Sequence, residues 1–221
     1  MSRRATARLD KLKTMHSFRA EPFLWIHLAG LATLPILLQL CWLGLAVGDP
    51  ILPVWLEFSI VAAIGVIPVL WMQLSRPFLI FAVLGVAQKP AQLDEQQRKV
   101  LRLIRTTSNR LLAMVAAVLL IGMLWLLYRT APIAASVVPL SPQWRGLGLL
   151  LASVTFFASN LFLQIPVSVA RVFVTSETEF SKAKPYPVER IARDFTIIGW
   201  QVNRILPQLT NAQTDTAHIK E

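Results

Sequence analysis

The feature that most constrains the fold is an uninterrupted apolar run near the start of the chain, from Phe23 to Val47. It holds 25 residues and no formal charge when its one histidine is neutral. At about 1.5 Å per residue, this run makes a helix about 37 Å long, which exceeds the roughly 30 Å hydrocarbon core of a bilayer. The run is also longer than the apolar core of a cleaved signal peptide. It therefore predicts a transmembrane helix.

Further apolar runs follow, and together they predict an all-α integral membrane protein. The segment Gly48 to Pro50 has the composition of a tight turn, so the first two spans are expected to form a helical hairpin. Only 15% of the residues are charged, well below the quarter that is typical of soluble domains. The predicted transmembrane domain, residues 23–174, has four helices at about 23–47, 52–74, 111–128 and 147–174.

Two segments between the second and third spans are predicted to stay outside the bilayer core. The apolar stretch 78–87 is too short to cross, so we expect an interfacial or re-entrant segment. Residues 93–110 have apolar side chains at helical spacing and predict an amphipathic cytoplasmic helix. Its basic side chains are candidates for contact with a partner or with lipid, although a surface helix that only obeys the charge rule is the favoured interpretation. These side chains are Arg98, Lys99, Arg102 and Arg105.

The distribution of basic residues predicts the orientation. The N-terminus, the three connections and the tail, counted from Arg171 at the end of the fourth span, contain 6, 0, 7, 2 and 7 of the 22 Lys and Arg residues. Cations gather on the cytoplasmic side of membrane proteins, so both termini and the middle connection are predicted to be cytoplasmic. The net charge of +10 is accounted for in this way, and we expect no nucleic-acid partner.

The two ends of the chain are predicted to be polar and cytoplasmic. Residues 1–22 form a basic N-terminus, 175–209 an amphipathic tail, and 210–221 a disordered end. The periodicity from Val188 to Ile205 predicts a helix of about five turns, but β-branched and aromatic residues around Gly199 also allow a strand. We favour the helix and expect the apolar surface of this tail, including Trp200, to contact a partner or lipid.

Polar residues inside the spans are few, and most are expected to join helices. Gln39, Glu57, Asn160 and Gln164 are interpreted as interhelix polar groups. Glu57 lies within the first turns of the second span, near the face opposite the cytoplasm, where tilt or snorkelling would bring it towards the headgroups, and no intramembrane cation is expected to pair with it. The sequence contains no catalytic motif and no cysteine-built metal site, since Cys41 is its single cysteine. We therefore predict that the protein is not an enzyme.

His27 lies about one and a half turns inside the cytoplasmic boundary of the first span, a depth of roughly 7 Å. At that level an imidazole can reach water, lipid phosphate or a neighbouring helix, and we expect a hydrogen bond of this kind. The competing hypothesis is that His27 is an axial ligand of a chlorophyll or another tetrapyrrole. Without a second ligand or motif, the hydrogen bond is the favoured interpretation, and no cofactor is expected.

Several stretches carry a resemblance to a known family. They are "SFRAEPFLWIHLAGLATLPILLQLCWLGLAVGDPILPVWLEF", "WMQLSRPFLIF", "APIAA" and "SNLFLQIPVSVARVFVTS". The chain resembles, over about Ser17 to Leu209, the cyanobacterial low-complexity tail membrane proteins, although its own tail is short and hardly of low complexity. The resemblance implies a multi-spanning protein of the thylakoid or plasma membrane of a cyanobacterium. It provides no catalytic residues to transfer.

These observations lead to one functional hypothesis and one alternative. The hypothesis is a non-enzymatic accessory or assembly protein that binds a larger membrane complex, such as a photosystem or its assembly intermediate, through its helix bundle and basic cytoplasmic surface. The alternative is a small-solute transporter or channel subunit, which should have a polar pathway through its spans. A lipid-modifying enzyme is less favoured, because it should gather His, Asp or Glu at one face.

Overall fold

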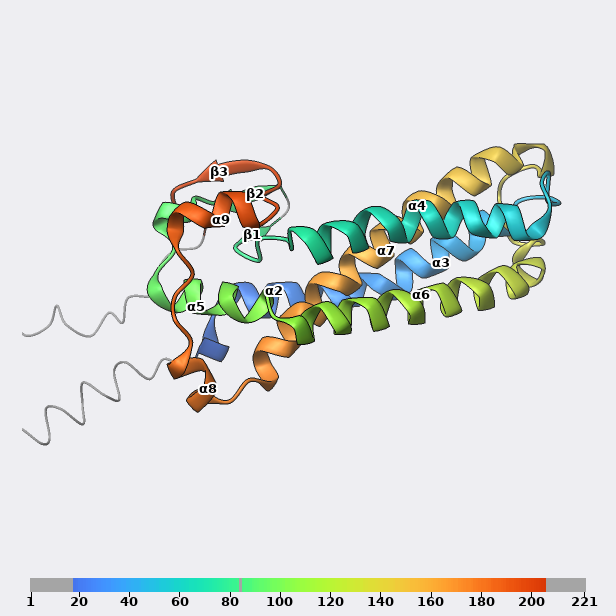
Figure 1. The fold of residues 1–221 in the computed structure, drawn as a ribbon. Coiled ribbons are helices and arrows are strands. Elements are labelled where there is room, and N and C mark those ends of the chain that lie inside the picture. The colour runs from blue at the N-terminus through green and yellow to red at the C-terminus, as the bar shows by residue number, and fades with distance from the viewer. Residues whose placement is uncertain (1–17, 84, 206–221) are drawn as a thin grey trace, which may run out of the picture.

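The computed structural model describes residues 18–83 and 85–205, in which long helices lie side by side with a smaller domain at one end (Figure 1). We call this domain the cap; it comprises residues 18–21, 76–83, 85–106 and 175–205. The bundle helices are α2 (Pro22–Ala29), η2 (Gly30–Thr33), α3 (Leu34–Leu45), α4 (Val54–Ser75), α6 (Thr107–Ala134), η4 (Pro142–Trp144) and α7 (Arg145–Val174). Four candidate spans, Pro22–Leu45, Val54–Ser75, Thr107–Ala134 and Pro142–Val174, are long and apolar enough to cross a membrane. The prediction of a helical protein with four spans is confirmed.

Exposed tryptophans lie towards both ends of the bundle. Trp25 and Trp71 are on the outer surface near the cap, and Trp55, Trp125 and Trp144 are on the outer surface towards the far end. Indole rings favour the headgroup region, because one edge is apolar and the other donates a hydrogen bond. Their arrangement in two groups fits a bundle that spans a bilayer.

The first span is divided, whereas the sequence predicted one continuous helix. A 3-10 turn, η2, separates α2 from α3, and Thr33 Oγ1 donates a hydrogen bond to Gly30 O at 2.7 Å within it. Pro35 follows directly and has no N–H to donate to the carbonyl four residues back, so the regular α-helical ladder breaks here. The deviation arises from local backbone chemistry and leaves the span intact.

Glycines set the closest helix contacts of the bundle. A Cβ atom on Gly148 of α7 would lie 2.6 Å from the carbonyl oxygen of Gly44 on α3, so the two backbones are in contact. On α4, a Cβ atom on Gly65 would lie 2.3 Å from the ring of Phe156. Close approach of this kind maximises van der Waals contact between helices, for which lipid provides no hydrophobic driving force. Gly44 and Gly148 therefore bring α3 and α7 into close contact.

The cap is a mixed α and β structure. Its elements are η1 (Phe18–Ala20), β1 (Ala82–Val83), β2 (Val86–Gln88), η3 (Pro90–Gln92), α5 (Glu95–Ile104), α8 (Glu177–Lys182), α9 (Val188–Asp194) and β3 (Trp200–Val202). The strands form one sheet in the order β1-β2-β3, in which β2 runs antiparallel to β1 and parallel to β3 (Figure 1). The described N-terminal and C-terminal regions therefore meet at the same end of the bundle.

The apolar core of the cap continues into the bundle. One buried cluster contains Phe81, Leu101 of α5 and Ile191 of α9. Phe81 belongs to residues 78–83, which lead into β1 and which we call the β1 segment. The same cluster includes Leu24 of α2 and Val169 of α7, which are parts of the candidate spans. The cap is therefore packed on the bundle through a shared core.

The amphipathic helix predicted over 93–110 is divided in the structure. Asp94 and Gln97 form a capping box that starts α5. The helix ends at Ile104, and Thr106 caps the next helix by accepting a hydrogen bond from Asn109 N. The predicted apolar face is confirmed, because Val100, Leu101 and their neighbours on it are buried.

The predicted five-turn helix in the tail is wrong beyond its first two turns. Helix α9 ends at Asp194, and the chain then becomes extended as far as strand β3. Gly199 has φ +96°, and a Cβ atom there would lie 1.7 Å from Gly85 O, so glycine is required at this crossing. The β-branched residues before it favour extended backbone, as the strand interpretation anticipated.

The described residues of the 78–87 segment are not helical; they contribute β1 and the start of β2 and form none of the candidate spans. Residues Phe78 to Phe81 are buried, and Phe78 forms a parallel bridge with Thr196. The ring of Phe81 packs edge-to-face on Phe23 of α2, with the ring centroids 5.5 Å apart. The expectations for residues 1–17 and 210–221 lie outside the described residues.

Candidate functional site

His27 is fixed by a hydrogen bond that also defines its tautomer. It lies on α2, and its Nε2 is 2.7 Å from the carbonyl oxygen of Ile80 in the cap. A carbonyl oxygen only accepts hydrogen bonds, so Nε2 carries the proton. In a neutral ring, Nδ1 then has a free lone pair. The hydrogen bond of His27 is therefore made to the backbone of the 78–87 segment, and not to a neighbouring helix as one of the expected alternatives had it.

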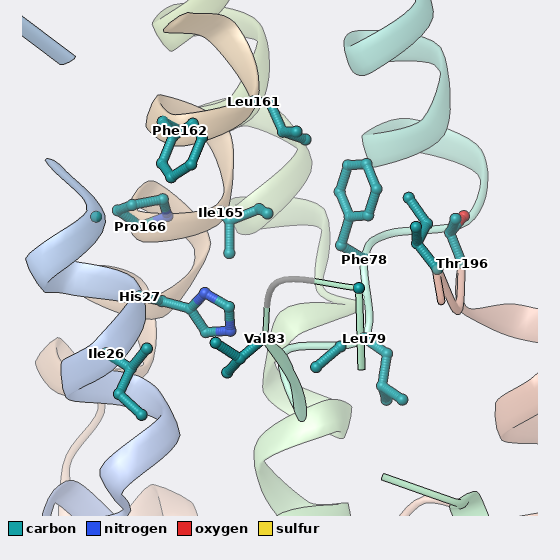
Figure 2. A pocket seen from close by; sticks show the side chains of 14 residues that line it. Ile26, His27, Phe78, Leu79, Val83, Leu161, Phe162, Ile165, Pro166 and Thr196 are labelled. Carbon is teal, nitrogen blue, oxygen red and sulfur yellow. The ribbon is translucent and has the colours of Figure 1, made fainter. Parts of the chain in front are cut away.

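An apolar cavity of about 370 Å³ lies next to this ring, between α2, α7, the β1 segment and residues 196–198. Figure 2 shows the imidazole among Ile165, Val83 and Phe162, three apolar side chains from the two sides of the cavity. Thr196 also lines the cavity, but its hydroxyl donates to Arg76 O at 2.6 Å. The described lining residues include no carboxylate. The cavity therefore offers an apolar space with one accessible ring nitrogen, Nδ1 of His27.

A tetrapyrrole ligand role for His27 stays a prediction. Of the two ring nitrogens, Nε2 is the less crowded, and it already donates its proton to Ile80 O. The remaining nitrogen, Nδ1, lies close to the Cβ atom of His27 itself. A flat macrocycle on Nδ1 would approach α2 closely, which makes this residue a poorer axial ligand than an imidazole with a free Nε2.

Glu57 has a partner that the sequence interpretation missed, and the expectation that it reaches to the headgroups is wrong. Its carboxylate forms an ion pair with Arg145 at the start of α7; the two side chains are 0% and 3% exposed. Tyr128 Oη and Ile51 N also donate to this carboxylate, at 3.0 Å and 2.9 Å. Arg145 donates further to Leu45 O at 2.6 Å. This cluster joins all four spans at the end opposite the cap.

The fourth span was predicted to begin at residue 147, which left Arg145 in the connection before it and hid the pair. Helices α4 and α7 both begin at the far end of the bundle, so Glu57 in the first turn of one and Arg145 at the start of the other lie at the same depth. The sequence signal that could have predicted the pair was an acidic and a basic residue at the same depth of two spans, Glu57 and Arg145. Among the described Lys and Arg, Arg129 is then the exposed cation at that end.

Two of the three predicted interhelix amides connect helices. Asn160 Nδ2 donates to Gly65 O at 3.0 Å, and Gln164 Nε2 donates to Ala113 O at 2.9 Å. Gln39 does not: its side chain is exposed on the outer face of α3 and has no hydrogen bond within the described residues. The prediction that Gln39 joins two helices of this chain is therefore wrong. Its amide lies on the outer surface of the bundle.

A second interior polar group, not predicted from the sequence, lies nearer the cap. Asn109 Nδ2 donates to Ser168 Oγ at 3.2 Å, and Gln73 Nε2 donates to the same oxygen. The amide oxygens of Gln73, Asn109, Asn160 and Gln164 are buried without a protein partner in the described part of the chain. Buried polar groups of this kind are common positions for ordered water.

The basic residues of α5 divide between surface and interior contacts. Lys99 pairs with Glu95 on its own helix at 3.0 Å, and Arg102 is exposed with its guanidinium 5.8 Å from the ring centre of Tyr186. Arg98 is half-buried, and its Nε has no partner among the described residues. Trp200, on the edge strand β3, is 85% exposed and available for an external contact.

Arg105 is used within the cap. It pairs with Asp194 at 2.8 Å, and Tyr186 Oη donates to the same carboxylate at 2.6 Å. The Tyr186 hydrogen bond and the Arg105 charge lower the pKa of the Asp194 carboxyl below its usual range. This cluster links α9 to α5 and has a structural role.

Comparison with known proteins gives one match. A family model described as low-complexity tail membrane protein-like matches residues 20–207. No curated protein and no solved structure matches the chain. The matched range covers all four candidate spans and nearly all of the described cap.

Proposed function

The chain belongs to the low-complexity tail membrane protein-like family, and from this premise we propose that it is a non-enzymatic accessory or assembly protein that associates with a larger membrane complex. The expected setting is the thylakoid or plasma membrane of a cyanobacterium, with both termini and the cap in the cytoplasm. A photosystem or its assembly intermediate is the partner that the resemblance suggests.

The observation that carries this proposal is the outward-facing amide of Gln39. The residue is 17 positions after Pro22 and six before Leu45, which places it roughly 25 Å and roughly 9 Å along the helix from these ends. An amide in contact with hydrocarbon leaves its hydrogen-bonding groups unsatisfied, at a cost of several kcal/mol. A transmembrane helix of another subunit, packed on this face of α3, would provide the missing partner. Ile36 lies one turn away and is 62% exposed, so it adds apolar contact area to the same face.

The cap supports the same proposal from outside the bilayer. Trp200 is exposed on β3, which lies at the edge of the sheet. Large exposed aromatic side chains are enriched in protein interfaces, because they bury much area with little loss of conformational entropy. With Arg102 on the surface of α5, the cap offers one aromatic and one cationic group to an acidic partner or to anionic lipid.

The transporter alternative is favoured by the buried amide oxygens without protein partners, which could line a polar path. Against it, the apolar side chains of Phe156, Leu124 and Val61 form a buried cluster that belongs to the middle of the bundle. This cluster lies between the Glu57–Arg145 pair and the amides nearer the cap. The amides of Asn160 and Gln164 are also bonded to neighbouring helices.

The test is affinity purification in mild detergent from native membranes, followed by mass spectrometry. We expect a defined complex to be purified together with the wild-type protein. With Gln39→Leu, most of that complex should no longer be recovered. The matched control is Ser59→Ala, an outward-facing polar residue whose hydroxyl is already bonded to Trp55 O at 2.7 Å.

Three outcomes would contradict the proposal. Recovery of the complex by Gln39→Leu at the wild-type level would show that the amide makes no contact that the complex needs. Purification of the wild-type protein only as copies of itself would replace the complex by a homo-oligomer. Solute flux into liposomes containing the purified protein alone would favour the transporter.

A further inference from the structure

We propose that the cavity beside His27 binds a membrane lipid with a slender apolar body and one hydroxyl group, and that this hydroxyl donates a hydrogen bond to His27 Nδ1. The cavity belongs to the junction between bundle and cap, so the site is distinct from the outer face of α3. Lipid binding here is independent of the proposed association with a complex, because the two surfaces share no residue.

The size and lining of the cavity define the body of the ligand. A volume of about 370 Å³ has room for about twelve groups of the size of a water molecule, at roughly 30 Å³ each. Its walls are made by aliphatic and aromatic side chains such as Leu161, Phe162 and Ile165. Such a lining favours a hydrocarbon segment and excludes a charged headgroup, whose burial would be costly.

The position of the cavity defines the route of entry. Ile26 on α2, Gly30 on η2 and Phe162 on α7 line it, and all three lie within the candidate spans. The same residues are only partly covered by protein, so the cavity is accessible from the surface that faces the acyl chains. A ligand dissolved in the bilayer can therefore enter sideways, without passing through water.

The chemistry of His27 defines the polar end of the ligand. Its Nε2–H donates to Ile80 O, and Nδ1 has no hydrogen bond to any described residue. Figure 2 shows the ring pointing away from α2 into the space between Ile165 and Val83. With no carboxylate among the described lining residues to stabilise an imidazolium, the ring is neutral and Nδ1 accepts. A hydroxyl provides the matching donor. An ether, an ester or a quinone carbonyl has only acceptors and would leave Nδ1 unpaired.

The experiment uses the purified full-length protein in lipid nanodiscs and two probes. One is hexadecanol that carries a photoreactive diazirine in its chain, and the other is its methyl ether, which lacks only the donor hydrogen. We expect the alcohol to label peptides that contain His27, Val83 or Phe162 about 3- to 10-fold more than the ether, as one net hydrogen bond predicts. Unlabelled hexadecanol should displace the alcohol probe.

Three variants separate the hydrogen bond from the fold. His27→Gln keeps a donor near the position of Nε2, so the contact with Ile80 can persist while the acceptor at Nδ1 is lost; alcohol labelling should fall to the level of the ether. Ala82→Leu should lower the labelling by both probes, because Ala82 lines the cavity and a larger side chain fills it. Gly122→Ala is the control, since a Cβ atom there would meet nothing within 4 Å.

The sources of such a hydroxyl are distinguished by competition. Displacement of the alcohol probe by a diacylglycerol or by a polyprenol would each support the proposal and name the class of lipid. Equal labelling of the cavity by the alcohol and the ether would overturn it, as would labelling spread over the outer face of the bundle. A tetrapyrrole that co-purifies with the wild-type protein, seen by its absorption spectrum, and is lost in His27→Gln would also overturn it.

Discussion

The ion pair between Glu57 and Arg145 makes the strongest prediction about stability. Its side chains are 0% and 3% exposed, so neither charge is solvated when the other is removed. The change Arg145→Met leaves Glu57 buried with only neutral donors, Tyr128 Oη and Ile51 N among them. It also removes the donor to Leu45 O. Breaking a buried pair from one side typically costs about 3–5 kcal/mol, and we expect the unfolding free energy to fall by that amount.

The measurement is unfolding of the detergent-solubilised protein by titration with a denaturing detergent, followed by tryptophan fluorescence. The matched control is Arg129→Met, which removes an exposed cation from the same end of the bundle and should change the free energy by less than about 0.5 kcal/mol. The variant Glu57→Leu should also be strongly destabilised. The double variant with Arg145→Met should lose less than the sum of the two single losses, because it leaves no unpaired charge.

This reasoning would be refuted if the losses of unfolding free energy in the two single variants simply added in the double variant. If Arg145→Met costs less than about 1 kcal/mol and its effect adds to that of Glu57→Leu, the pair is not desolvated and water reaches it in the folded protein.

Two more predictions concern packing and pH. Gly148→Ala should lower the unfolding free energy by about 1–3 kcal/mol, because its Cβ atom would lie 2.6 Å from Gly44 O, whereas Gly122→Ala should leave it unchanged or slightly higher; the same titration measures both. The folded-state pKa of Asp194 is lowered, so its contribution to cap stability is present above its unfolded pKa of about 3.9 and is lost as the pH falls through the lower folded value. Hydrogen exchange of the cap between pH 6 and pH 3 should show this loss, and Asp194→Asn should flatten the profile; a variant that keeps the wild-type profile contradicts the assignment.

The spans could be predicted because the thickness of the bilayer sets the number of consecutive apolar residues that a helix needs to cross it. The apolar runs 52–74 and 147–174 fall within candidate spans of the structure almost unchanged. The buried face of α5 could be predicted for a related reason: it alternates with polar residues, and that periodicity marks the side that is buried.

The same logic explains why Gln39 was misplaced. Helix α3 is apolar on all sides, so no periodicity in its sequence distinguishes the face against α7 from the face towards lipid. The Glu57–Arg145 pair was missed because it depends on relative depth in two helices about 90 residues apart in sequence, at the boundary of a span. The cap sheet likewise depends on pairing between β2 and β3, which no local pattern encodes.

That parallel pairing determines when the cap can fold during synthesis. Strand β2 emerges from the ribosome before the third and fourth spans, and its partner β3 emerges after them. The sheet, together with the core that Ile191 completes, can therefore close only once both later helices have been made. A mature cap is thus a marker of finished membrane insertion, and a nascent chain arrested at Val174 would present Phe81 and its neighbours to chaperones or to the lipid surface.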